Sequence, residues 1–170
     1  MDEAAKAMAE SLFEAIKAEG DGRSFYMMAA RSTADDKARE VFGQLADEEL
    51  GHQEFLKAQY RSILENGTID SAAKLGRPRD LSEASPIFSA GLKSRIKEAH
   101  MEMSALAIGI QLELGAMNYY REAAGRASDP AIKAFFSELA EWESGHYNAL
   151  LRQQEALKED YWSAAGFSPF

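Results

Sequence analysis

The chain has 170 residues, of which 46% are hydrophobic and 28% are charged, a composition typical of a soluble globular domain and not of a disordered chain. It has no apolar run long enough to span a membrane and no secretory signal at its start, so we expect a cytoplasmic protein. The absence of cysteine excludes disulfides, thiolate zinc sites and cysteine-ligated iron centres within this sequence. The net charge of −9 argues against nucleic acid or anionic membranes as partners.

Helical periodicity covers most of the chain, and it predicts two antiparallel helical hairpins. The first spans residues 5–66, with Ser32 and Thr33 as N-cap candidates for its second helix. Residues 67–92 contain several glycines and prolines and break the periodicity, so they predict a long crossover. The second hairpin spans residues 93–158, and residues 159–170 form an aromatic tail. The sequence therefore predicts an all-α four-helix bundle in one domain over residues 1–170.

A metal-ligand pattern occurs twice, each time as a lone glutamate, a tyrosine seven residues later and a Glu-x-x-His motif. Corresponding members lie 94 residues apart: Glu19, Tyr26, Glu49 and His52 in the first copy, and Glu113, Tyr120, Glu143 and His146 in the second. Residues 12–56 and 106–150 align at this offset without a gap, and fourteen positions are identical. We therefore expect the two hairpins to be related by an approximate two-fold axis, with a site on that axis.

The glutamates and histidines of this pattern stand at helix positions where the periodicity calls for apolar residues. An isolated buried carboxylate is very costly, so these positions need a compensating partner. Residues i and i+3 share a helix face, so each Glu-x-x-His pair can contact one ion. Four carboxylates balance the charge of two divalent cations. Mixed carboxylate and imidazole ligation suits iron, with manganese or zinc as alternatives.

The six glutamates and histidines are thus the predicted ligands of two metal ions. We expect Glu19 and Glu113 to be shared between the two ions. Tyr26 and Tyr120 lie two turns further along the same stripe and are predicted to donate hydrogen bonds to the ligands or to bound oxygen species.

The residues next to the motifs have simpler interpretations. Asp47, Glu48 and Glu141 point off the buried face and are expected to be solvated. Gly51 and Gly145 are expected to permit close helix packing, because glycine otherwise costs about 1 kcal/mol inside a helix.

The doubled motif resembles the rubrerythrin branch of the ferritin-like di-iron carboxylate superfamily, over residues 5–158. This resemblance implies a ferritin-like four-helix bundle with two iron ions held by the six residues. It also implies reduction of hydrogen peroxide or dioxygen, with oxidation of bound ferrous iron. Rubrerythrins are commonly dimers, so a homodimer is expected.

The chain departs from the family pattern in two places. It lacks the four cysteines of a rubredoxin-like domain, so it looks like the stand-alone members, which would need an external electron donor protein. Ala116 and its counterpart Gly22 stand where the family tends to have a further glutamate. Two alternatives therefore stay open, a non-enzymatic iron-handling protein and a structural bundle that holds zinc.

Overall fold

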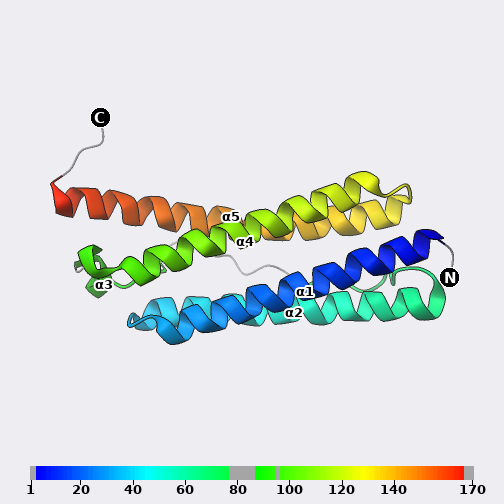
Figure 1. Cartoon of the computed structure of the whole chain (residues 1–170), viewed down its shortest axis with the longest axis horizontal. Helices are drawn as coiled ribbons and strands as arrows, with labels where there is room; N and C mark the ends of the chain where they lie inside the picture. The colour runs from blue at the N-terminus through cyan, green and yellow to red at the C-terminus, as the bar shows by residue number, and fades with distance from the viewer. Residues whose placement is uncertain (1–2, 77–86, 95, 167–170) are drawn as a thin grey trace.

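The computed structural model describes residues 3–76, 87–94 and 96–166, and within them it contains only helices and their connections. The helices are α1 (Glu3–Ser32), α2 (Asp36–Asn66), α3 (Ala90–Ser94), the 3-10 helix η1 (Ile96–Glu98), α4 (His100–Arg126) and α5 (Pro130–Ala165). α1 packs along α2 and α4 packs along α5, as two antiparallel hairpins whose turns lie at opposite ends of the bundle (Figure 1). The predicted all-α, ferritin-like bundle is confirmed.

An aspartate caps the second helix of each hairpin. Asp35 accepts a hydrogen bond from the backbone N–H of Ala38 at 2.9 Å, so it is the N-cap of α2. The expectation that Ser32 or Thr33 would cap this helix is wrong, because Thr33 donates its hydroxyl to Glu102 at 2.8 Å instead. Asp129 caps α5, where Pro130 occupies the first turn and its missing N–H costs nothing. The two aspartates are again 94 residues apart.

The connection between the hairpins runs along the bundle. α2 ends at Gly67, whose φ of 75° is a left-handed conformation that glycine adopts without strain. The chain returns to the opposite end of the bundle at α3 (Figure 1), where the backbone N–H and hydroxyl of Ser89 donate to Asp35. Residues 77–86 of the predicted crossover lie outside the described residues. Because α3 and η1 intervene, the long helix of the second hairpin begins at His100 and not near residue 93.

The end of the chain is more helical than expected. α5 continues to Ala165, so the predicted tail is wrong for residues 159–165. Tyr161 packs against the apolar core, and Asp160 forms an ion pair with Lys93 at 3.2 Å. Residues 167–170 lie outside the described part.

The core consists of two apolar clusters separated by a polar layer. One cluster gathers residues near the start of α1 and the end of α2, including Leu12 and Leu56. The other gathers residues near the end of α1 and the start of α2, including Tyr26 and Phe42. Along each long helix, the predicted ligands fall between the stretches that contribute to the two clusters.

No described helix is long and apolar enough to cross a membrane.

Candidate metal centre

The structure brings all six predicted ligands together in the polar layer. Each is at most 4% exposed. Their donor atoms form two groups whose members lie within 4.8 Å of one another: Glu49, Glu113, Glu143 and His146 in one, and Glu19, Glu49 and His52 in the other. The doubled sequence pattern therefore folds into a single buried cluster contributed by all four long helices.

The carboxylates that lie between the two groups are Glu49 and Glu143. Glu49 belongs to both groups, and the two oxygens of Glu143 lie 3.2 Å from Nδ1 of His52 and 3.6 Å from Nδ1 of His146. Glu19 and Glu113, which the sequence predicts to be shared, each belong to one group only. Each of them faces the histidine of its own hairpin, with Glu19 3.3 Å from His52 and Glu113 3.7 Å from His146.

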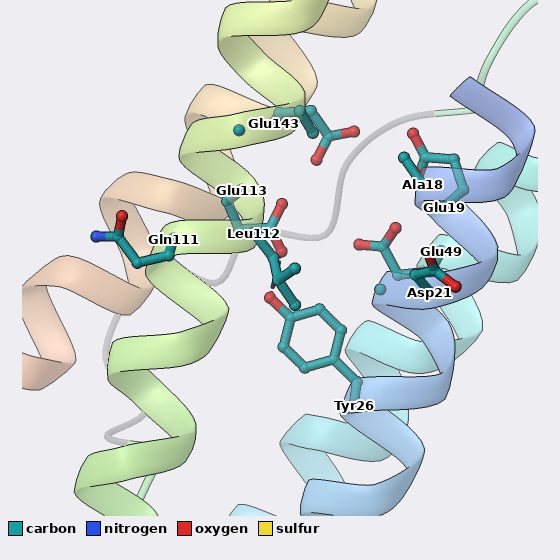
Figure 2. A pocket seen from close by; sticks show the side chains of 12 residues that line it. Ala18, Glu19, Asp21, Tyr26, Glu49, Gln111, Leu112, Glu113 and Glu143 are labelled. Atoms are coloured by element: carbon teal, nitrogen blue, oxygen red, sulfur yellow. Dashed lines mark hydrogen bonds between the residues drawn. The ribbon is translucent and has the colours of Figure 1, made fainter. Parts of the chain in front are cut away.

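The two tyrosines cross between the hairpins. The Tyr26 hydroxyl donates a short hydrogen bond to Glu113, and the Tyr120 hydroxyl donates one to Glu19. Figure 2 shows Tyr26 reaching from α1 toward Glu113 on α4. Burial and the neighbouring carboxylates raise the pKa of both hydroxyls well above the usual value, so both stay protonated donors. Each tyrosine thus donates to a predicted ligand of the opposite hairpin.

The pKa values of the carboxyl groups are shifted in different directions by burial, by neighbouring glutamates and by the two histidines. Burial, followed by the charges of neighbouring glutamates, raises the pKa of Glu49 well above its usual value. Burial also raises the pKa of Glu113 to about 7, although the nearby imidazole of His146 opposes the shift. Burial would raise the pKa of Glu143 too, but the nearby imidazoles of His146 and His52 hold it well below its usual value. Glu143 therefore keeps its charge most readily.

The histidines are held by these carboxylates. Burial alone would lower the pKa of His52, but Glu143 and Glu19 raise it to about 9. The pKa of His146 is likewise raised well above its usual value, because Glu113, Glu143 and Glu48 outweigh the effect of burial. Without a cation, protons are the only counter-charges that this cluster has among the described side chains.

The donor set fits the binding of transition-metal cations. Among the described residues, neither oxygen of Glu143 nor Nδ1 of His146 has a hydrogen-bond partner, although all are buried. An unsatisfied buried acceptor is costly, and a metal ion satisfies it. Four carboxylates and two imidazoles are a ligand set that iron, manganese and zinc accept in helix bundles.

Two residues of the site have no role in the sequence-based prediction. The expectation that Glu48 would be solvated is wrong, because its carboxylate accepts a hydrogen bond from Nε2 of His146 at 2.7 Å. The Trp142 ring packs edge-on against the His52 ring, with the centroids 4.8 Å apart. Asp47 and Glu141 are exposed, as predicted. The available signal was that positions 48 and 142 correspond at the 94-residue offset but carry different residues.

A cavity of about 260 Å³ opens beside the cluster between α1 and α4. Its lining includes Glu19, Glu49, Glu113 and Glu143, which Figure 2 shows facing one another across the gap between these helices. Gly22 and Ala116 also line it. A Cβ on Gly22 would lie 3.3 Å from Oε2 of Glu49, so a larger residue there would press on this carboxylate.

The glycines of the two motifs do not have the predicted packing role. Gly51 and Gly145 are both exposed, and a Cβ on either would meet nothing within 4 Å. The small residue that lets a neighbour approach the centre is Gly22, on α1.

Comparison with known proteins agrees with this geometry. A family model described as Rubrerythrin matches residues 10–104 and 104–165. Neither the curated proteins nor the solved structures gave a match. The matched segments cover most of the chain and contain all six buried glutamates and histidines. The chain belongs to the rubrerythrin family.

Proposed function

We propose that the protein is a di-iron carboxylate oxidoreductase that reduces hydrogen peroxide or dioxygen while bound ferrous iron is oxidised. The observation that carries this proposal is the cluster of four carboxylates and two imidazoles buried beside a cavity. In this proposal Glu19 and His52 would hold one ion and Glu113 and His146 the other, while Glu49 and Glu143 stand between the two groups. Membership of the rubrerythrin family supports iron as the metal.

Bound ferrous iron would supply electrons, and reduction of one hydrogen peroxide to two waters would consume two electrons and two protons. The chain's own residues would position the ions and admit the oxidant. Tyr26 and Tyr120 hold Glu113 and Glu19 by hydrogen bonds, which fixes the terminal carboxylates. The cavity between α1 and α4 leads to the same carboxylates, and the exposed side chains of Asp21 and Gln111 line it. The small side chains at Gly22 and Ala116 leave this passage open to a small molecule.

Electrons would come from a separate donor protein. The sequence contains no cysteine, so none of its residues can form a cysteine-ligated iron centre. Reduction of the oxidised centre by an added one-electron donor protein, in the absence of peroxide, would support this part of the proposal.

The function is tested by mixing the ferrous-loaded, oxygen-free protein with hydrogen peroxide or with dioxygen in a stopped-flow spectrophotometer. We expect rapid oxidation by peroxide or dioxygen with the iron retained. Leu112→Trp should slow oxidation several-fold, because Leu112 lines the cavity. Ile108→Trp is the matched control, since Ile108 is 48% exposed on the same helix and is absent from the cavity lining.

The alternatives give different results in the same experiments. Oxidation by dioxygen alone, followed by release of iron, would favour the iron-handling protein. Metal analysis that finds zinc and no iron, in protein from iron-supplemented cells, would favour the structural bundle. Equal rates for Leu112→Trp and Ile108→Trp would contradict the cavity as the route of the oxidant.

We also propose that the chain forms a homodimer. Several large apolar side chains are exposed on the long helices, among them Met28 at 57% and Phe13 at 51%. Sedimentation velocity of the whole chain should give a dimer mass, and a monomer at micromolar concentration would contradict the proposal.

Removal of residues 161–170 should lower the melting temperature by several degrees, because Tyr161 packs against the core. An unchanged melting temperature would mean that this packing contributes little.

A further inference from the structure

The two histidines of the centre differ on the side of the ring that faces away from the carboxylates. Both turn Nδ1 toward the cluster, where Nδ1 of His52 lies 3.3 Å from Glu19 and Nδ1 of His146 lies 3.6 Å from Glu143. Nε2 of His146 donates to the carboxylate of Glu48 at 2.7 Å. Nε2 of His52 is buried and has no hydrogen-bond partner among the described residues. The otherwise symmetric centre is therefore unsymmetric at this point.

This difference arises from a single pair of corresponding positions in the repeat. Glu48 on α2 reaches across to His146 on α5, and Trp142 on α5 reaches across to His52 on α2. The Trp142 ring stands edge-on to both imidazoles, but its centroid is closer to His52, at 4.8 Å, than to His146, at 6.4 Å, and it is His146 that contacts the Glu48 carboxylate. Each copy of the motif thus supplies the environment of the other copy's histidine.

An imidazole that binds a cation through Nδ1 keeps its proton on Nε2. A carboxylate that accepts this proton fixes the tautomer and the orientation of the ring, and it makes Nδ1 a stronger donor to the metal. Glu48 provides that acceptor for His146. No described residue provides one for His52, whose ring is instead held by aromatic packing.

The arrangement of the donor atoms also differs between the two histidines. Around His146, four residues place one donor atom each within 4.8 Å of one another, whereas the corresponding group around His52 contains three. Glu48 is itself well buried, with 13% of its side chain exposed. Its hydrogen bond to His146 is therefore formed away from bulk water, where such a bond is strongest.

We propose that Glu48 makes the two metal positions unequal, so that the position at His146 fills first and holds its ion more tightly than the position at His52. The inference rests on the proposed two-metal function. Glu48 is a positioning residue that acts through His146. The consequence is ordered loading of the centre, with the more readily exchanged ion beside His52 and Trp142.

The test is a titration of the metal-free protein with Co²⁺, followed by the visible absorption of the bound ion. The unsubstituted protein should show two binding steps of different affinity. Glu48→Gln keeps the size of the side chain but removes its charge, and it should weaken the first step by roughly 10- to 100-fold, the usual effect of losing such a partner. The second step should change little. Asp47→Asn is the matched control, because it removes the same charge from an exposed neighbour on the same helix.

A coupling experiment assigns the step to its histidine. In a His52→Ala background the tight step should remain and should still respond to Glu48→Gln. In a His146→Ala background the tight step should be absent, and Glu48→Gln should have no effect. Circular dichroism verifies that each variant keeps its helices.

The outcomes separate this inference from the proposed function. Two equal binding steps that are indifferent to Glu48→Gln would overturn the inference and leave the two-metal function standing. An equal loss in Asp47→Asn, or an effect of Glu48→Gln that persists without His146, would also overturn it. Failure of the unsubstituted protein to bind two Co²⁺ ions would overturn both.

Discussion

Replacement of Glu49 by glutamine is expected to abolish binding of both metal ions, whereas Glu19→Gln should leave one ion bound. Glu49 belongs to both groups of donor atoms, and Glu19 belongs to the group around His52 alone. Removal of the Glu49 charge also leaves each prospective ion with fewer carboxylates to offset its desolvation. Glutamine keeps the volume of the side chain, so the loss should reflect ligation and not a cavity.

The measurement is the number of Co²⁺ or Fe²⁺ ions retained per chain after equilibrium dialysis. Glu143→Gln should behave like Glu49→Gln, since its oxygens lie near both histidines. Glu113→Gln should behave like Glu19→Gln. Asp47→Gln serves as the control, because this acidic residue is exposed and close in sequence to Glu49. Equal losses in Glu19→Gln and Glu49→Gln would contradict the assignment of Glu49 as the shared carboxylate.

The metal-free protein is expected to lose stability as the pH rises from about 5 to about 9. Burial raises the pKa of Glu113 from 4.5 to about 7, so the folded state binds more protons than the unfolded state between these values. Its contribution is present below the unfolded pKa and is lost as the pH rises through the folded pKa. His52, whose carboxylate partners raise its pKa from 6.5 to about 9, continues the same trend at higher pH.

The pKa shifts of the other groups in the centre predict the same loss of stability with rising pH, or have no effect in this range. The pKa values of Glu49 and His146 are also raised, so their protons are likewise lost as the pH rises. The lowered pKa of Glu143 gives a contribution that is lost only as the pH falls below its usual value of 4.5, outside this range. The total loss of unfolding free energy should be on the order of a few kcal/mol, because one pKa unit corresponds to about 1.4 kcal/mol.

Urea unfolding at pH 5, 7 and 9, with a chelator or with saturating metal, measures this dependence. Metal binding should reverse the trend, because the cations compete with protons for the same ligands. Glu113→Gln should flatten the metal-free curve between pH 4.5 and 7, since it removes the group that titrates there. A metal-free protein that becomes steadily more stable from pH 5 to pH 8 would contradict the clustering of these carboxylates.

The clustering of the six glutamates and histidines could be predicted because the information is local to each helix. A glutamate in the apolar stripe signals that a buried partner exists, and the 94-residue repeat indicates that the two hairpins share it. The same reasoning failed for Glu48. A residue next to Glu49 on a helix points about 100° away from it, which places it off the buried face of its own hairpin. His146 approaches from α5 and meets it there.

The sequence by itself therefore determined the helical fold, the six clustered residues and the two tyrosines, because periodicity and repetition place them on matching faces. Only the tertiary structure decided which of these residues contact one another. It shows that Glu49 and Glu143 stand between the two groups, that each tyrosine serves the opposite hairpin, and that Glu48 and Trp142 distinguish the histidines. These features depend on distances between helices, which are set by the packing of the hairpins. The spacing of residues along one helix does not predict them.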